Sequence, residues 1–319
     1  MKMVEIDHLS KTFGVFQAVD DITLSVSKGE VLGFLGPNGA GKTTTMRMVA
    51  GFLTPSGGTA RVCGHDVTTH PTAVKSAIGY MPEGSPSYDD MTVGDFLKFI
   101  AEIRGFSGAE RDARVAKVAA RVDLTAVLER PIDILSKGYR RRVGLAQAII
   151  HDPPVLLLDE PTDGLDPNQK HQVRGLIAEM AAEKAIIIST HILEEVEAVC
   201  TRTVIIGNGK VLADGTAAEL LTRLPDHRAV CVVLPTAGAA MAATHFRNHP
   251  AVAGVFETQE SGGRTKLRLT PKDGVDLVEQ IATTVQANNI SVIEIYQDGG
   301  TLDDVFRLIT TGRVTHAAA

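Results

Sequence analysis

The sequence contains no tryptophan and only 4 tyrosines among its 319 residues. Proteins that bind single-stranded nucleic acid stack its bases on aromatic side chains, so a base-stacking platform is not expected here. Basic side chains are not in excess either, because 32 Lys and Arg stand against 38 Asp and Glu, for a net charge of −6. This balance excludes a broad basic surface, although a local patch remains possible, and we expect no nucleic-acid partner.

Long apolar runs are missing as well. Wholly apolar stretches, such as Val155–Leu158 and Ala185–Ile188, span only a few residues, whereas a membrane-spanning helix needs about 20. Met1–Ser10 carries charges and lacks the continuous apolar region of a signal peptide. The 3 cysteines lie far apart in the sequence. They fit neither a zinc knuckle nor a disulfide framework, and they suit a reducing cytosol.

The remaining composition is that of a globular protein, with 44% hydrophobic and 22% charged residues. At about 100–200 residues per domain, the length predicts two domains. The first part of the chain reads as α/β, since short apolar runs alternate with segments of helical periodicity. The predicted buried strands are Val31–Gly36, Val155–Asp159 and Ala185–Thr190, and the helices between and after them include Thr43–Phe52 and Ile192–Cys200.

Other segments of the first part predict antiparallel pairing. Glu5–Leu9 and Ile22–Val26 alternate polar and apolar residues, as half-exposed strands do. Thr203–Asp214 places Asn208-Gly209 between two apolar strands. Asn-Gly supplies the positive φ angles of a type I′ turn, so this segment predicts a hairpin.

A second domain is predicted from the change of pattern near Pro225. The expected elements are strand 229–235, helix 237–248, strands 251–257 and 264–270, helix 272–288, strand 290–297 and a last helix at 302–310. The order βαββαβ is that of a small α+β, ferredoxin-like unit. Gly262-Gly263 fits the turn between the middle strands, and Val275, Val278, Ile281 and Val285 form an apolar stripe. We predict domains at 1–224 and 225–312, with a tail at 313–319.

A glycine-rich segment matches the pattern G-x-x-x-x-G-K-[ST] and lies between a predicted strand and helix. Glycines let successive backbone N–H groups turn toward phosphate oxygens, and the N-terminus of the helix that follows attracts the same charge. Lys42 would reach the β- and γ-phosphates, and the Thr43 hydroxyl would bind Mg²⁺. We expect ATP to be bound by Gly36, Pro37, Asn38, Gly39, Ala40, Gly41, Lys42, Thr43 and Thr44.

An acidic pair ends the second buried strand. Asp159 is placed where a carboxylate can hold Mg²⁺, and Glu160 could polarise an attacking water. Taken alone, such a pair is more often a helix cap or a solvated turn. The glycine-rich loop favours the catalytic interpretation.

Between these two motifs lies the segment Leu135, Ser136, Lys137, Gly138 and Tyr139, followed by a helical stretch. It resembles the LSGGQ signature of ATP-binding cassette (ABC) proteins. Three further matches follow in the family's order: Gly164-Leu165-Asp166 is similar to the D-loop, His191 to the switch histidine, and Phe13 to the aromatic residue beside the adenine ring. The resemblance covers residues 3–223. It extends to subunits of ABC-2-type exporters, above all the gliding-motility-associated ones.

The resemblance implies a P-loop NTPase fold, with an antiparallel β subdomain and a helical subdomain beside the parallel sheet. It also implies head-to-tail homodimers that bind ATP and Mg²⁺, in which the signature (Leu135–Tyr139) of one chain faces the phosphates of the other. Glu160 and His191 would act in catalysis, and Thr43, Asp159 and Glu83 would serve Mg²⁺. Glu83 stands where the family usually has Gln, and an acid can still reach a hard cation.

The residues of the signature and the arginine run after it allow both a structural and a functional interpretation. Ser136 is expected to cap the helix that follows it, and Gly138 to permit a close approach of backbone. Lys137 replaces the first glycine of the common signature and could add positive charge near the phosphate. For the run Arg140–Arg142 we favour a solvated helix face over a functional role.

The sequence therefore predicts the ATPase subunit of a bacterial transporter, peripheral on the cytoplasmic face of the membrane. A separate ABC-2-type permease would supply the path and dock on Gly84–Phe106. Two alternatives remain: a soluble ABC ATPase acting on ribosomes or DNA, and a cassette that binds ATP without hydrolysing it. The intact Lys42, Asp159, Glu160 and His191 argue against the second. The transported substrate is not encoded in any motif found here.

Overall fold

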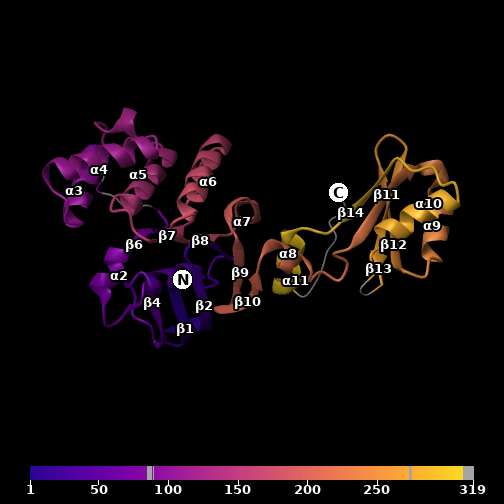
Figure 1. The fold of residues 1–319 in the computed structure, drawn as a ribbon, viewed down its shortest axis with the longest axis horizontal. Helices are drawn as coiled ribbons and strands as arrows, with labels where there is room; N and C mark the ends of the chain where they lie inside the picture. Colours follow the sequence, from indigo (N-terminus) through magenta and orange to yellow (C-terminus); the bar gives the residue numbers. More distant parts are fainter. Residues whose placement is uncertain (85–87, 89, 273–274, 312–319) are drawn as a thin grey trace. The chain divides into compact units, whose positions relative to one another are not determined.

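The computed structural model describes residues 1–84, 88, 90–272 and 275–311. The chain forms two compact units, Met1–Thr216 and the residues from Ala217 onward (Figure 1). Along the sequence, the first unit ends eight residues before the predicted boundary at 224. Each unit has its own sheets and its own apolar core.

A six-stranded sheet forms the centre of the first unit, with the strand order β10-β9-β3-β8-β7-β6. All neighbours are parallel except β10, which pairs antiparallel with β9. The three predicted buried strands are β3, β7 and β8, and every residue in them is buried. The strands of this sheet are β3 (Val31–Leu35), β6 (Ile78–Met81), β7 (Val155–Asp159), β8 (Ala185–Thr190), β9 (Arg202–Gly207) and β10 (Lys210–Gly215).

The predicted Asn-Gly hairpin joins β9 to β10. Asn208 and Gly209 have φ angles of 50° and 77°, the positive values that a type I′ turn requires. A second, antiparallel sheet has the order β2-β1-β4-β5 and contains both predicted half-exposed strands. Its strands are β1 (Lys2–Phe13), β2 (Phe16–Ser27), β4 (Gly57–Val62) and β5 (His65–Asp66).

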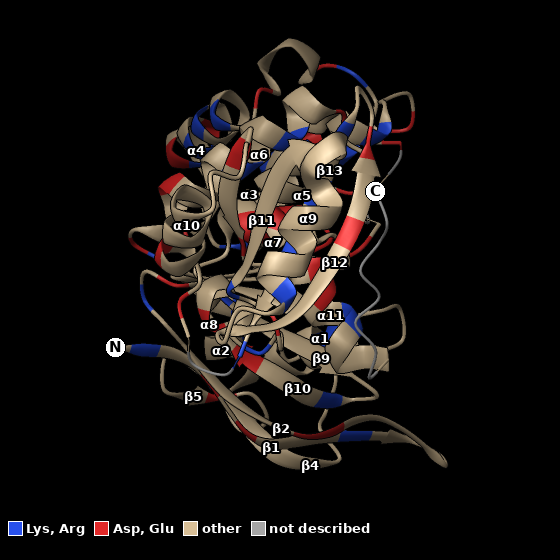
Figure 2. Cartoon of the chain, turned by 90° about the vertical axis from the view of Figure 1, so that its right-hand side faces the viewer, with Lys and Arg blue, Asp and Glu red and all other residues tan. Residues whose placement is uncertain are grey.

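Helices cover the sheets and form a layer of their own, in which α3 packs against α4 and α5 (Figure 1). Acidic and basic side chains both occur along α4 (Figure 2). The elements are α1 (Lys42–Val49), α2 (Pro71–Ala77), α3 (Val93–Ile103), α4 (Gly108–Arg121), the 3₁₀ turn η1 (Thr125–Val127), α5 (Lys137–Ile149), α6 (Pro167–Ala181) and α7 (Leu193–Val199). Within the described ranges, no helix has both the length and the apolar character needed to cross a membrane.

The helix predicted to reach Phe52 ends earlier, at Val49. Gly51 adopts a φ of 70°, and the N–H groups of Phe52 and Leu53 turn back to the carbonyl of Arg47. This is the left-handed helix ending that glycine favours, and it interrupts an apolar pattern that would otherwise continue.

The second unit contains a four-stranded antiparallel sheet with the order β12-β13-β11-β14. This is the arrangement expected of a βαββαβ unit, and side chains of α9 and α10 pack into its core. Gly262 and Gly263 have φ angles of 78° and 72°, as expected for the turn between the middle strands. The elements are α8 (Ala217–Leu221), β11 (Ala229–Pro235), α9 (Thr236–Arg247), β12 (Val252–Glu260), β13 (Arg264–Pro271), α10 (Val278–Ala287), β14 (Glu294–Asp298) and α11 (Leu302–Thr311).

Two predicted elements of this unit are shorter than expected. The helix predicted from 272 begins at Val278, although Val275 still packs against the core beside Ile281. The strand predicted from 290 begins at Glu294, opposite Val233 of β11. Two residues further along β11 stands Pro235, which has no N–H to extend the ladder. The predicted tail at 313–319 lies outside the described residues.

Candidate nucleotide site

Three neighbouring strands of the central sheet end side by side. In the register of β3, β8 and β7, Leu35 pairs with Thr190 and Asp159 pairs with Ser189. The loop after β3 and the polar residues after β7 and β8 therefore meet at one edge of the sheet. Ligands in α/β folds bind at such carboxyl ends of strands.

The glycine-rich loop turns directly into α1. Gly41 has a φ of 104°, and a Cβ there would lie 2.6 Å from the carbonyl oxygen of Ala18. Lys42 follows, and only 6% of it is exposed. Its Nζ donates to the carbonyls of Gly36, at 2.7 Å, and Pro37, at 3.2 Å. Burial lowers the pKa of Lys42, while the nearby acids raise it in opposition. The amino group is thus held over the loop that would receive the phosphates.

Asp159 has the environment of a cation ligand. The residue is 1% exposed, and its Oδ1 accepts hydrogen bonds from Ser189 Oγ and from Thr43 Oγ1, the latter at 3.3 Å. Its Oδ2 is buried and has no hydrogen-bond partner among the described residues. Buried carboxylate oxygens are normally paired, so this atom fits the place of a hard cation such as Mg²⁺.

Glu160 is held in a conformation that non-glycine residues seldom adopt, with a φ of 52°. Its N–H donates to the carbonyl of Ser189 at 3.1 Å, and its Oε1 lies 2.9 Å from Nδ1 of His191. The other oxygen, Oε2, is buried without a partner in the described part of the chain. Burial raises the pKa of Glu160, and the contact with His191 lowers it in opposition. Both features are typical of functional carboxylates.

A cavity of about 390 Å³ collects most of the predicted ATP-binding and catalytic residues. Among its walls are Phe13, Asn38, Gly39, Gly41, Lys42, Thr43, Thr44, Glu83, Glu160 and His191. Asp159, Gly36, Pro37 and Ala40 do not line it, and Asp159 is instead buried behind Thr43. The roles of all these residues stay predictions, but the structure brings them together at one site.

The cavity has three further lining residues that the sequence analysis missed: Phe16, Ala18 and Asp163. Phe16 pairs with Phe13 across the β1–β2 turn, and about half of each side chain or more is exposed (60% and 49%). The sequence does contain a signal for Phe16, because it lies three positions after Phe13 across a turn that contains Gly14. Asp163 had no local signal, because its position depends on tertiary structure.

The signature segment lies outside this cavity, at the start of α5. Ser136 is the N-cap, as predicted, and its Oγ accepts from the N–H of Tyr139 at 3.3 Å. Lys137 donates to Asp163 Oδ2 at 2.7 Å, and this bond lowers the pKa of Asp163. Gly164 is the next residue, and a Cβ there would meet Lys137 at 2.4 Å. Within one chain, Lys137 is therefore paired with the segment that includes the predicted D-loop.

The D-loop residues directly precede α6. Leu165 is buried, and Asp166 caps the helix in a capping box with Gln169. Gln169 also reaches the signature, because a Cβ on Gly138 would lie 2.5 Å from its Oε1. The two family motifs thus touch at Lys137 and Gly164, and Gly138 lies against Gln169 of α6.

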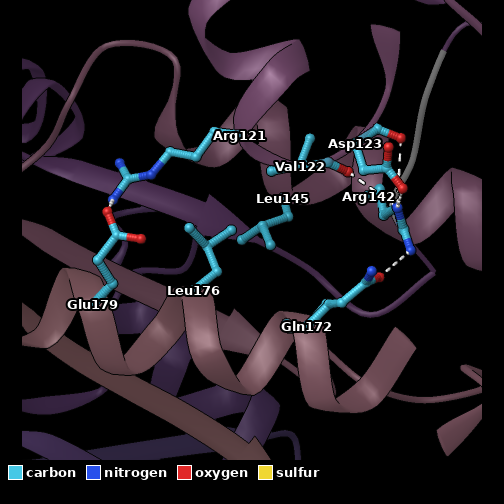
Figure 3. Close-up of a pocket in the computed structure, with 9 residues that line it drawn as sticks. Arg121, Val122, Asp123, Arg142, Leu145, Gln172, Leu176 and Glu179 are labelled. Atoms are coloured by element: carbon cyan, nitrogen blue, oxygen red, sulfur yellow. Dashed lines mark hydrogen bonds and ion pairs between the residues drawn. The ribbon is translucent and has the colours of Figure 1, made fainter. Parts of the chain in front are cut away.

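The prediction of a solvated face for Arg140–Arg142 is wrong for two of the three residues. Arg140 is exposed, but Arg141 and Arg142 are only 5% and 7% exposed. Arg142 donates to Asp123 Oδ2 at 2.6 Å and to Gln172 Oε1 at 2.7 Å, at one side of a cavity of about 280 Å³ (Figure 3). Arg141 bonds Asp163. The helix is covered on these sides, so its charges face partners from other segments.

A glycine-rich loop that opens a helix, beside a strand ending in a buried acid pair, defines a P-loop nucleotide-binding ATPase. The family model that matches is described as ABC transporter and covers residues 19–163. The chain belongs to the ABC transporter family: it is an ATP-binding subunit of an ABC transporter and an ATP hydrolase.

Similar proteins include subunits of the exporter type. The Nod factor export ATP-binding protein I of Ralstonia nicotianae is 32% identical over 312 residues, 98% of this chain and 94% of the relative. The ABC transporter ATP-binding protein NatA of Bacillus subtilis is 40% identical over 65% of this chain and 85% of its own. The daunorubicin/doxorubicin resistance ATP-binding protein DrrA of Streptomyces peucetius is 37% identical over 70% and 68%. None of these three names refers to gliding, and that part of the resemblance stays a prediction.

Solved structures agree on the fold. One, an ATP-binding subunit of an ABC transporter, has a TM-score of 0.65 and 31% identity, and the match covers 69% of this chain and 92% of that chain. A dimeric ATP-binding cassette in a post-hydrolysis state has a TM-score of 0.63 at 21% identity, over 67% and 98%. The predicted fold class is confirmed.

Proposed function

We propose that this subunit hydrolyses ATP to power a separate membrane permease of the ABC-2 type, and that the transport is export. The relatives named for Nod factor export and for drug resistance support the direction. The observation that carries the chemical part is the convergence of Lys42, Glu160 and His191 on one cavity. With that permease as its anchor, the chain would be peripheral on the cytoplasmic face.

In this proposal each residue at the sheet edge has one task. Lys42 and the N–H groups of the loop hold the phosphates, and Phe13 stacks on the adenine ring. Thr43, Asp159 and Glu83 would hold Mg²⁺, which neutralises phosphate charge when bound. Glu160 accepts a proton from the attacking water, and His191, at 2.9 Å, orients that carboxylate.

We further propose that two copies associate head to tail, so that residues 135–139 and 164–166 of one chain complete the site of the other. The capped N-terminus of α5 would then face the γ-phosphate. The second unit would support this dimer or regulate it. The permease would dock on residues 84–106, of which 85–87 and 89 lie outside the described residues.

The test uses Glu160→Gln in the full chain. We expect ATP hydrolysis to fall by about a hundredfold or more, since the variant loses the general base, while ATP affinity stays within about twofold. In the presence of ATP this variant should then accumulate as a dimer, which sedimentation velocity would detect. His171→Gln, at an exposed position of α6, is the matched control. Substantial residual hydrolysis by Glu160→Gln would refute the assigned role.

The transport part needs a second measurement. The gene neighbouring this one should encode a multi-span protein, and co-expression should allow the two chains to be purified together. Phosphate release should rise when that partner is present in vesicles. A chain that hydrolyses ATP yet captures only ribosomal or DNA-bound partners would contradict the transporter assignment.

A further inference from the structure

Glu195 is a buried acid with no part in the proposed chemistry. It lies on α7, four residues after His191, and only 4% of it is exposed. Fully buried glutamates are rare unless they are paired. Lys170 Nζ lies 3.9 Å from its Oε1, which is near the limit of an ion pair.

Each oxygen of this carboxylate accepts a hydrogen bond from a different threonine. Thr162 Oγ1 donates to Oε1, and Thr190 Oγ1 donates to Oε2 at 2.9 Å. Both threonines are themselves buried. The hydroxyl of Thr190 also accepts the N–H of Ile192 at 3.0 Å, so it is occupied on both sides.

The two threonines occupy informative places in the chain. Thr162 is two residues after Glu160, and Thr190 is directly before His191. One carboxylate thus ties together the two segments that carry the predicted catalytic pair. The contact between that pair, 2.9 Å from Nδ1 to Oε1, spans 31 residues of sequence. The β7–β8 ladder holds the backbones of the two segments together, and Glu195 adds a side-chain link beyond the ends of the strands.

We propose that Glu195 is a positioning residue for ATP hydrolysis: its carboxylate holds Thr162 and Thr190, and through them it sets the spacing between Glu160 and His191. The proposal rests on the roles assigned above to those two residues. It adds an acid that does not line the ATP cavity.

Two variants of the full chain separate the hydrogen bonds of Glu195 from its charge. In Glu195→Gln the amide oxygen can accept from one threonine and the NH₂ can donate to the other hydroxyl, so the tie is kept without its charge. In Glu195→Ala both bonds are lost. Glu194→Gln, at the neighbouring exposed position that pairs with Arg174, is the control.

We expect Glu195→Ala to lower kcat by about tenfold to a hundredfold with an unchanged KM for ATP, because misplaced reacting groups cost rate rather than binding. Glu195→Gln should restore most of kcat at neutral pH. Glu194→Gln should match the parent in both kcat and KM.

Three results would overturn the proposal. The first is an unchanged kcat in Glu195→Ala. The second is a fall in kcat accompanied by a rise in KM, which marks a distorted nucleotide site rather than a misplaced catalytic pair. The kcat is expressed per ATP-binding site counted by calorimetry, because unfolded chain lowers the apparent kcat without changing KM. The third is a kcat of Glu195→Gln as low as that of Glu195→Ala, because the two hydrogen bonds would then not set the rate. If the parent itself fails to hydrolyse ATP, or if Glu160→Gln keeps its rate, the proposed function fails instead, and the two failures are distinguishable.

Discussion

Lowering the pH should destabilise the first unit through His151, which follows α5. Its Nε2 lies 3.1 Å from the carbonyl oxygen of Ile78, so this nitrogen carries the proton of the neutral ring and donates it. The other nitrogen, Nδ1, is buried and has no acceptor within the described residues. Burial lowers the pKa of His151 to about 4, and the charges of Arg104, Lys184 and Arg114 act in the same direction.

The size of the effect follows from this pKa. The unfolded chain takes up a proton near pH 6.5, whereas the folded chain resists it until about pH 4. Between these values the unfolded state binds more protons, so the free energy of unfolding falls as the pH falls. Each pKa unit is worth about 1.4 kcal/mol, and the full loss below pH 4 is therefore about 3 kcal/mol. Above pH 6.5 the histidine contributes no pH dependence.

The assay is urea unfolding of the full chain at several pH values between 4 and 7.5. The transition of the first unit is recognised because ATP shifts it. His151→Gln keeps a donor for Ile78 and does not titrate, so it should lose about 3 kcal/mol less than the parent between pH 6.5 and pH 4. His171→Gln, on the exposed side of α6, is the control. Equal pH dependence in the parent and His151→Gln would refute this reasoning.

Three further outcomes are expected. Lys42→Ala should weaken ATP binding by about tenfold to a hundredfold, since a charge-assisted bond to phosphate is worth about 1.5–3 kcal/mol; equal affinities by calorimetry would contradict it. Arg142→Ala should lower the free energy of unfolding by about 1–3 kcal/mol, because it removes the hydrogen bonds that the buried guanidinium donates to Gln172 and to the exposed carboxylate of Asp123, whereas the exposed Arg140→Ala should cost about 1 kcal/mol or less. Similar urea midpoints for the two variants would refute this argument from burial. Truncation after Thr216 should leave each site intact but weaken the dimer, so the specific ATPase rate should fall on dilution. The cut is made there because α8 packs on α11 and belongs to the second unit. A specific rate that falls no more on dilution than that of the full chain would refute a dimer-supporting role.

The nucleotide loop and the strands beside it could be predicted from local sequence patterns. β3, β7 and β8 consist mainly of apolar residues, and in each the apolar run is followed directly by glycine or by polar residues. Parallel strands end at a common edge, so residues after different strands could be placed together without any knowledge of the strand order. The structure adds the order itself, in which β8 lies between β3 and β7.

Contacts between distant segments could not be predicted in this way. Asp163 lines the ATP cavity and also binds Lys137, but a single aspartate in a turn has no periodicity that would single it out. Glu195 lies in an acidic stretch typical of a solvated helix start, and only the fold shows that its carboxylate faces two threonines. Pairings of this kind depend on which helix covers which strand.

The burial of part of the run Arg140–Arg142 could have been predicted from the sequence. Neighbouring positions on a helix differ by about 100°, so Arg140, Arg141 and Arg142 spread over more than half of the helix circumference. They cannot all face water when the residues after them, Val143 to Leu145, are apolar or small and buried. A charged run at the start of such a helix must therefore bury at least one cation, and a buried cation needs an acid from another segment. Asp163 and Asp123 supply those acids, which means that the position of Asp163 beside the ATP cavity is tied to the helix that carries the signature.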